Sequence, residues 1–476
     1  MHANWIANTW VEGQDVNTNI NPANLDEIVG EYARASRDQA LDAIRAARAA
    51  FEEWQYATPQ MRFDALDLIG SEILERKEEL ATLLTREEGK TLPEAAGEVA
   101  RAGAVFKYFA GEALRNAGDR LASVRPGVEA ETTREPVGVV GLVTPWNFPI
   151  AIPAWKIAPA LAYGNCVVFK PAELVPGSGW ALAEIISRAG LPEGVFNLVM
   201  GAGSVVGAAL GESNDVDAVS FTGSTAVGEG LRRQVTARGG RIQLEMGGKN
   251  PLLVMDDADL DNAVDCAVNG AFFSTGQRCT ASSRLIVDRR IQERFTEAML
   301  DRMQTLRVGD GLDPETDIGP VISESQLRQV NDYLVLSRQE GARVEGGGPV
   351  EAATRGHFIR PALLLETDNA MRVNQEEIFG PVASILPVDG FEEGLALANA
   401  TEFGLSAGIC TRSLKLASEF RRRARTGMVM VNLPTAGVDY HIAFGGRKAS
   451  SYGPREQGAY AREFYTVVKT AYTLPL

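Results

Sequence analysis

The sequence predicts an α/β protein built on a parallel β-sheet with helices on both faces. Between residues 137 and 247, short apolar runs alternate with helical stretches. Strands buried on both faces read as continuous apolar runs, and parallel strands need helical connections between them. The expected strands are 137–144, 166–170, 195–199, 217–222 and 241–245, and the helices lie near 154–163, 177–188, 204–211 and 225–236.

Residues 1–120, ahead of this sheet, are predicted to be helical. Ser36 and Gln39 form a capping box before an apolar stripe at helical spacing. Further helix boundaries are read at Thr58-Pro59, Gly89, Pro93 and about Gly118.

A second α/β unit follows the sheet. Asp259 can cap a helix whose apolar positions recur at helical spacing. Further strands are expected near 283–287, 382–388, 405–411 and 428–432. The polar stretch 122–136 and the C-terminal stretch 462–474 alternate like exposed strands, and neither has an obvious partner nearby in sequence.

The composition is that of an ordinary globular protein with an acidic surface. The 476 residues include 47 Lys and Arg against 62 Asp and Glu, a net charge of -15. Nucleic-acid binding needs clustered basic residues and is not expected. The apolar run 150–169 contains Lys156, Pro153 and Pro159, which favours a buried helix and strand over a membrane span. The N-terminus lacks the pattern of a signal peptide, so a cytoplasmic location is expected.

Cys279 differs from the other three cysteines. Cys166 and Cys410 lie in apolar strands and Cys266 lies on a helix stripe, as buried small hydrophobes do. Cys279 follows a helix, in a polar loop beside Arg278, and a neighbouring cation favours the nucleophilic thiolate. With no CxxC pair and three histidines, neither a disulfide framework nor a metal site is expected.

Polar residues follow the predicted strands at the edge where ligands bind in such sheets. Asn147, after the first strand, could donate its amide to a developing oxyanion, or serve the turn that Asn and Pro favour. Glu245 ends the fifth strand and could be a general base, or only a terminal charge. Lys170 and Glu173, just past the second strand, could hold ribose hydroxyls or form a solvated salt bridge.

Two glycine turns are candidate anion sites, although such turns are usually only turns. In FTGSTAVG (221–228), Gly223 permits the turn and Ser224 can cap the following helix, whose amides would face an anion. Gly201 lies in the second such turn.

Seven motifs occur in the order typical of the aldehyde dehydrogenase superfamily, which the sequence resembles over essentially its whole length. Seven ordered motifs are far more specific than any one alone. They are TPWNFP, KPAE, FTGS, LEMGGKNP, GQRC, EEIFGP and FGGRKASSYG.

The resemblance implies a mechanism for three of these residues. Cys279 is similar to the nucleophile that attacks the aldehyde, and Asn147 with the Cys279 backbone amide would hold the resulting oxyanion. After hydride transfer, Glu245 would activate the water that hydrolyses the thioester. A CoA-acylating relative needs no such carboxylate, and a silent structural relative would not keep all three residues.

The resemblance also implies a nicotinamide dinucleotide as cofactor. Lys170 and Glu173 resemble the adenosine-ribose contacts, Ser224 the pyrophosphate contact, and Glu377 with Phe379 the contacts to the nicotinamide ribose and ring. A carboxylate at Glu173 repels a 2'-phosphate, so NAD is expected to be preferred, with some NADP use through Lys170. The expected cofactor residues are Thr144, Pro145, Trp146, Lys170, Glu173, Gly201, Phe221, Gly223, Ser224, Glu377 and Phe379.

The fold class implied is that of an aldehyde dehydrogenase, with a Rossmann-type cofactor domain, an α/β catalytic domain and a β oligomerisation flap. The cofactor domain would comprise 1–120 and 137–247, and the catalytic domain 248–447. The flap would comprise 121–136 and 460–476, and would join a homodimer or homotetramer.

Within the family, the sequence looks most like dehydrogenases of 2-oxoglutarate semialdehyde (2,5-dioxopentanoate). The segments WKIAPAL, FFSTGQRCTASSR, GVDY and SSYGPREQG carry this similarity. The stretch 150–155 lacks the polar and basic pocket of another branch, so succinate semialdehyde or a broader range of aldehydes remains the alternative. The expected substrate-binding residues are Trp155, Arg278, Thr280 and Phe444, with Arg278 assigned to a substrate carboxylate.

Overall fold

Eight strands form the first central sheet of the computed structural model, which describes residues 1–475. Across the sheet they are β2 (Thr9–Val11), β1 (Asn4–Ile6), β9 (Phe196–Leu198), β8 (Cys166–Lys170), β7 (Val139–Val143), β10 (Ala218–Thr222), β11 (Arg241–Glu245) and β21 (Ser451–Tyr452). The five strands from β9 to β11 are parallel to one another, and the flanking strands β1 and β21 pair with them in an antiparallel orientation. This confirms the predicted α/β class and parallel sheet.

The strand order reverses beside β7. The chain adds β8 and β9 on one side of β7 and then crosses over to add β10 and β11 on the other. Such a switch point opens a crevice at the carboxyl ends of the strands, because the flanking connections leave in opposite directions. The ends of β7 and β10 therefore define where a ligand site is expected.

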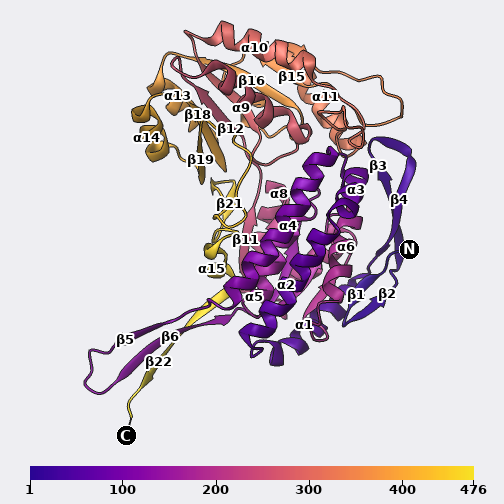
Figure 1. The fold of residues 1–476 in the computed structure, drawn as a ribbon, viewed down its shortest axis with the longest axis vertical. Coiled ribbons are helices and arrows are strands. Elements are labelled where there is room, and N and C mark those ends of the chain that lie inside the picture. Colours follow the sequence, from indigo (N-terminus) through magenta and orange to yellow (C-terminus); the bar gives the residue numbers. More distant parts are fainter. Residues whose placement is uncertain (476) are drawn as a thin grey trace.

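Helices cover this sheet, as Figure 1 shows for the N-terminal bundle in front of it. The bundle contains α1 (Arg37–Trp54), α2 (Pro59–Glu75), α3 (Lys77–Glu88) and α4 (Leu92–Ala113). The crossover segments are α5 (Ala151–Ala162), α6 (Pro176–Ser187), the π-helix η1 (Gly203–Gly207), α7 (Ala208–Glu212) and α8 (Thr225–Ala237).

Local signals placed several helix ends correctly. The predicted capping box at Ser36 is present, with both reciprocal hydrogen bonds to Gln39. Thr58 caps α2 ahead of Pro59, and Gly89 ends α3 with a left-handed φ of 99°. Each of these residues satisfies backbone groups that a helix end leaves unpaired.

Three predictions about elements ahead of the second sheet were wrong in part. Residues 4–34 form strands, including the hairpin β3 (Asp15–Asn21) and β4 (Asn24–Arg34), because hairpin pairing outweighs weak local preference there. The fourth helix ends at Ala113, five residues before Gly118. The helix near 204–211 begins as a π-helical turn.

The second central sheet has seven strands. In order they are β14 (Arg343–Gly346), β15 (Ala362–Leu365), β16 (Val382–Val388), β13 (Ser282–Asp288), β12 (Asn250–Val254), β18 (Ser406–Cys410) and β19 (Met428–Val431). Its helices are α9 (Leu260–Phe272), α10 (Gln292–Thr305), α11 (Glu324–Gln339), α12 (Arg372–Gln375), α13 (Phe391–Ala398) and α14 (Leu414–Arg423). The short elements are η2 (Phe273–Gly276), β17 (Phe403–Gly404), β20 (Arg447–Lys448), η3 (Ala459–Ala461) and α15 (Arg462–Tyr465).

A three-stranded sheet projects from the body of the molecule (Figure 1). It contains β5 (Asp119–Ala122), β6 (Glu129–Pro136) and β22 (Thr466–Thr473). β22 pairs with β6 in an antiparallel register from Thr466↔Pro136 to Thr473↔Glu129. The C-terminal strand thus finds its partner more than three hundred residues away, and it begins at Thr466 because 462–465 forms a short helix. β6, in contrast, also has a local partner, since it forms a hairpin with β5.

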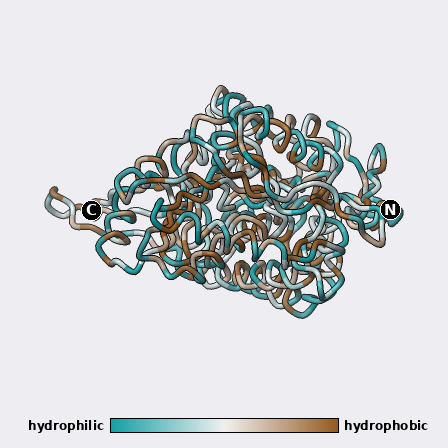
Figure 2. The backbone as a smooth tube through the Cα atoms, turned by 90° about the horizontal axis from the view of Figure 1, so that it is seen from above, coloured by the Kyte–Doolittle hydropathy of each residue, from teal (hydrophilic) through white to brown (hydrophobic). Residues whose placement is uncertain are grey.

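The core lies between the sheets and their helices. Figure 2 shows hydrophobic segments running through the interior, and the two termini at opposite ends of the molecule. Trp54 is buried and donates its indole N–H to the Asn165 carbonyl at 3.1 Å, which ties α1 to the turn before β8. Over residues 1–475, no helix combines the length and hydrophobicity that a membrane crossing requires.

Candidate active site

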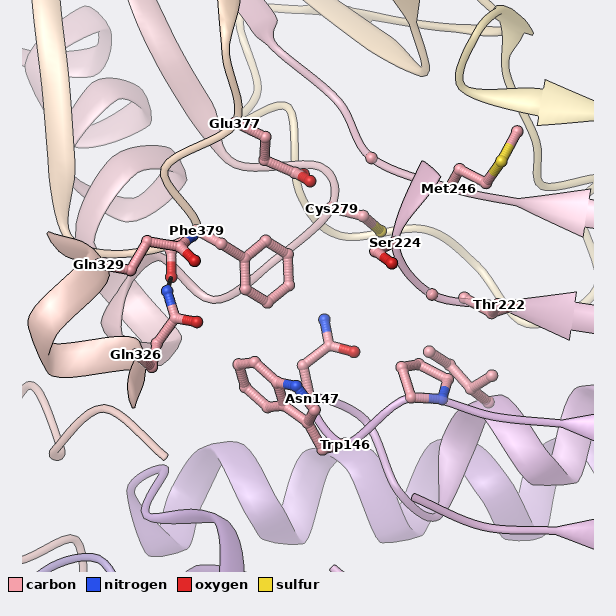
Figure 3. Close-up of a pocket in the computed structure, with 14 residues that line it drawn as sticks. Trp146, Asn147, Thr222, Ser224, Met246, Cys279, Gln326, Gln329, Glu377 and Phe379 are labelled. Atoms are coloured by element: carbon pink, nitrogen blue, oxygen red, sulfur yellow. Dashed lines mark hydrogen bonds between the residues drawn. The ribbon is translucent and has the colours of Figure 1, made fainter. Parts of the chain in front are cut away.

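A cavity of about 300 Å³ lies at the switch point of the first sheet (Figure 3). It is lined by the residues after β7 and β10, by the loop that carries Cys279, and by the segment around Glu377. In Figure 3 the Asn147 amide, Cys279, Glu377 and the Phe379 ring all point toward its middle. The lining residues are Pro145, Trp146, Asn147, Ile152, Thr222, Gly223, Ser224, Met246, Gly247, Cys279, Gln326, Gln329, Glu377 and Phe379.

Cys279 is the one cysteine of the chain that is not buried. The residue is half-buried, and desolvation of its thiol raises the pKa, which the Glu377 and Glu245 carboxylates raise further, so the neutral thiol is favoured. The expectation that Arg278 favours the thiolate is wrong: its guanidinium donates to Glu94 at 3.1 Å, which balances its charge. The thiol therefore needs a base or a bound cation to become nucleophilic.

The loop before Cys279 has an unusual backbone conformation. Ser274, Thr275 and Gly276 have φ of 49°, 55° and 65° in succession. Such left-handed residues are costly unless the surroundings fix them. Glu94 accepts hydrogen bonds from the backbone N–H and the hydroxyl of Ser274, at 2.8 and 2.9 Å. A Cβ on Gly276 would lie 2.1 Å from a backbone oxygen, so only glycine fits there.

Asn147 is held through its side-chain amide nitrogen and through its backbone carbonyl. Its side-chain Nδ2 donates to the Gln277 carbonyl at 2.9 Å, and its own carbonyl accepts from Lys90 Nζ at 2.6 Å. Lys90 also pairs with buried Glu98 at 2.6 Å. The second amide hydrogen of Asn147 therefore remains for a ligand, and the side chain has a fixed direction.

Glu245 lies beside the cavity without lining it. It is buried, and the Ser451 hydroxyl donates to its Oε2, while Oε1 has no hydrogen-bond partner. Burial and the nearby Glu456 carboxylate raise its pKa well above the ordinary value. A buried carboxyl with one free oxygen and a raised pKa has the character of a general base.

A buried ion pair behind Glu245 was missed at the sequence level. Lys156 pairs with Glu456, and its Nζ also donates to the Ser220 hydroxyl at 2.7 Å. Lys156 is the lone charge in an apolar helix, and buried charges are generally paired with an opposite charge. That signal was present in the sequence, but it does not identify Glu456, which lies 300 residues away.

Glu377 and Phe379 lie on one side of the cavity, as the predicted cofactor contacts require. Gly248 N–H donates to Glu377 at 2.9 Å, and burial raises the pKa of this carboxyl to about 7. Phe379 has a left-handed φ of 58°, and its ring meets Trp146 edge-on at 5.3 Å. Gln326 on α11 donates to the Phe379 carbonyl at 2.9 Å, so α11 holds this segment in place. The sequence did not indicate this contribution of α11.

The glycine turn after β10 is open for an anion. Ser224 is the N-cap residue of α8, but its hydroxyl makes no capping hydrogen bond. Gly223 is needed for space and not for its φ, because a Cβ would lie 2.6 Å from the buried Phe221 ring. The free hydroxyl and the first amides of α8 therefore face the cavity together.

Lys170 and Glu173 do not form the solvated salt bridge that was one alternative. Lys170 is buried, its Nζ donates to the Pro171 carbonyl at 2.7 Å, and burial lowers its pKa to about 8. Glu173 instead pairs with Arg34 at 3.1 Å.

Two further predicted cofactor residues lie close to neighbouring backbone. Gly201, with φ of 146°, lies where a Cβ would be 3.2 Å from the Ala35 nitrogen. Thr144, buried at the end of β7, donates its N–H to the Lys170 carbonyl.

The predicted substrate residues divide into two sets. Trp155 stacks on Phe444 at 5.4 Å, and Phe444 belongs to an apolar cluster against which Cys279 packs. Thr280 is buried behind Cys279, where its carbonyl accepts from Thr435. Arg278 does not line the cavity and is committed to Glu94. Its assignment to a substrate carboxylate stays a prediction.

Comparisons with known proteins agree with this geometry. The model of the aldehyde dehydrogenase family matches residues 10–471. The chain is 44% identical to the alpha-ketoglutarate semialdehyde dehydrogenase of Haloferax volcanii, over 98% of each chain. It is 43% identical to the alpha-ketoglutaric semialdehyde dehydrogenase of Bacillus subtilis, over 100% of this chain and 98% of the relative. The crystal structure of Staphylococcus aureus betaine aldehyde dehydrogenase with NAD+ has a TM-score of 0.97 at 36% identity, over 100% and 95% of the two chains. The chain belongs to the aldehyde dehydrogenase family.

Proposed function

We propose that this enzyme oxidises 2-oxoglutarate semialdehyde to 2-oxoglutarate with NAD and water. The observation that carries the reaction is the convergence of the Cys279 thiol and the fixed Asn147 amide on one cavity, with the buried Glu245 carboxyl beside it. The two relatives at 44% and 43% identity, both named for this semialdehyde, support the substrate.

The residues fit a dinucleotide at the switch point. The free Ser224 hydroxyl and the amides at the start of α8 suit a pyrophosphate, and the Glu377 carboxylate suits ribose hydroxyls. NAD, when bound, accepts the hydride from the substrate carbon. Lys170 and Glu173 at the end of β8 would hold the second ribose.

In the proposed mechanism, the Cys279 thiol first loses its proton to solvent water. The thiolate Sγ then attacks the aldehyde carbon and forms a tetrahedral thiohemiacetal oxyanion. The Asn147 Nδ2–H and the Cys279 backbone N–H donate to the oxyanion, which has its full charge only in the tetrahedral state. Loss of hydride leaves a thioester on Cys279. Glu245 then takes a proton from water, which attacks the thioester and releases the carboxylate product and the free thiol.

Steady-state kinetics across matched aldehydes tests the substrate. We expect the highest kcat/KM with 2-oxoglutarate semialdehyde, a lower value with succinate semialdehyde, and the lowest with pentanal, which has the same chain length and no carboxylate. NADH absorbance at saturating NAD gives each value. A preference for pentanal would remove the semialdehyde assignment and leave a broad-specificity dehydrogenase.

Cofactor choice is expected to depend on Glu173. A 2'-phosphate would meet this carboxylate. In a Glu173→Ser variant Arg34 would lose its 3.1 Å pairing with Glu173 and keep only the longer one with exposed Asp15 at 3.8 Å, so its Nη2 could meet the phosphate. We expect this variant to raise the ratio of kcat/KM for NADP over NAD about tenfold, which corresponds to about 1.4 kcal/mol.

A matched variant separates charge from size at this position. Glu173→Gln keeps the volume and removes the charge, so it should move the ratio in the same direction. A wild-type enzyme with clearly higher kcat/KM for NADP would contradict the assignment of Glu173.

We also propose that the projecting sheet joins a homodimer or homotetramer. β22 is an edge strand with unpaired backbone groups, and Val468, Tyr472 and Leu121 on this sheet are exposed. Long exposed edges invite pairing with another chain. Light scattering after size exclusion distinguishes the two assemblies from a monomer.

The cytoplasm is the proposed compartment. All four cysteines are free thiols, and Cys279 must stay reduced for its role. Free thiols persist in reducing compartments.

A further inference from the structure

Arg101 on α4 has a half-buried guanidinium without a carboxylate partner. Its Nη2 donates to the Gln457 Oε1 at 2.9 Å, while its buried Nε has no hydrogen-bond partner. Among residues 1–475, no carboxylate oxygen lies within 4.0 Å of it. Burial lowers its pKa, because removing the guanidinium from water disfavours the charged form.

The guanidinium adjoins the stacked pair of Trp155 and Phe444, two of the predicted substrate-binding residues. Its Cζ is 5.4 Å from the centre of the Trp155 ring, and Trp155 stacks on Phe444 at 5.4 Å. Phe444 packs in the apolar cluster that Cys279 joins. An uninterrupted run of contacts thus connects the guanidinium to the reacting sulfur.

The other two arginines near the nucleophile already have partners. Arg278 is paired with Glu94. Arg455 donates to the Gly446 carbonyl and acts on the catalytic-site carboxylate Glu245, whose pKa it lowers. The charges that face Arg101 do not neutralise it either: Glu98 is paired with Lys90 and accepts two backbone N–H groups, and Asp439 lies on an exposed loop. Arg101 is therefore a cation beside the Trp155 ring whose charge no carboxylate within ion-pair distance balances among residues 1–475, and a ligand can balance it.

We propose that Arg101 binds the far carboxylate of an acidic aldehyde substrate. The planar guanidinium suits a carboxylate, and the Trp155 and Phe444 rings form the apolar wall along the carbon chain between carboxylate and aldehyde. An anion is recognised here because a partly desolvated cation gains most from a matching charge. This inference rests on the proposed function, since it names the group that selects an acidic substrate.

The Arg101→Met variant tests this directly, because methionine keeps much of the packing on Trp155 and removes the charge. We expect kcat/KM for 2-oxoglutarate semialdehyde to fall about 10- to 100-fold, mainly through KM, from loss of hydrogen bonds to a charged group. The value for pentanal should change by less than about threefold. Lys107→Met is the matched control, since Lys107 lies on the same helix and pairs with Asp67 away from the site.

Two further variants keep the test decisive if Arg101→Met folds poorly. Arg101→Lys should recover part of the preference for the acidic aldehyde, because it retains charge and loses the planar fork. Arg101→Glu should favour 4-aminobutanal over the semialdehyde. Equal losses for pentanal and semialdehyde in all three variants overturn the role of Arg101. A wild-type preference for pentanal overturns the proposed substrate itself, before any variant is made.

Discussion

Cys279→Ala is expected to abolish aldehyde oxidation and leave NAD binding intact. The thiol supplies the bond that holds the substrate during hydride transfer, and alanine has no atom to replace it. Cys279 lies on the cavity wall, yet its loop is fixed by groups other than the thiol: Asn250 Nδ2 donates to its carbonyl at 2.8 Å. We therefore expect a fall in kcat of at least about 10³-fold, measured as NADH formation, with an unchanged Kd for NAD by calorimetry.

The other cysteines provide matched controls of the same chemistry. Cys166, Cys266 and Cys410 are buried, and none lines the cavity. Their alanine variants should lose packing and about 1 kcal/mol of stability, with little change in kcat. Substantial NADH production by Cys279→Ala, or loss of turnover in Cys166→Ala at full folding, would show that the nucleophile lies elsewhere.

The sequence indicated the cavity because the strand ends and the Cys279 loop that line it can be recognised from short stretches of sequence. A parallel sheet places the carboxyl ends of all its strands at one edge, so Asn147 and the turn at Gly223 meet once the strands are recognised. The position of Cys279 in a polar loop separated it from three cysteines in apolar elements. Burial bears out this distinction.

The supporting residues could not be inferred because they act across long distances in the chain. Glu94 fixes the Cys279 loop from 184 residues away, and Glu456 neutralises Lys156 from 300 residues away. Proximity to a cation also misled: Arg278 adjoins Cys279 in sequence, but its guanidinium turns to Glu94. Arg101, on a helix whose pattern indicated only packing, instead lies over the ring of Trp155, a predicted substrate residue.

The hairpin of β3 and β4 was missed for a different physical reason. Its strands lie at the surface, where the burial pattern that marks a strand is weak. Its pairing depends on cross-strand contacts over residues 15–34. It also depends on contacts with the rest of the fold: the Asn19 side chain, for example, donates to the Leu174 carbonyl at 2.8 Å. Single-strand propensity does not report such contacts.

Glu245→Gln is expected to separate the two half-reactions. Acylation of Cys279 and hydride transfer should still occur, whereas thioester hydrolysis should slow about 10²- to 10⁴-fold, the usual contribution of a general base. Stopped-flow mixing should then give a burst of one NADH per active site, followed by slow turnover. A variant without a burst would show that Glu245 also removes the proton from the Cys279 thiol.

The pH profile identifies the base more sharply than the rate alone. Burial and Glu456 raise the pKa of Glu245, so its basic form is lost as the pH falls through that raised value and hydrolysis should slow there. Ser451 opposes this shift, because its hydroxyl donates to the carboxylate and favours the charged form. Ser451→Ala should therefore move the rising limb of the hydrolysis rate to higher pH while keeping its plateau, whereas Glu245→Gln should remove the limb altogether. If Ser451→Ala left the limb in place, the titrating group would be another residue, and the hydrolytic role of Glu245 would be lost with it.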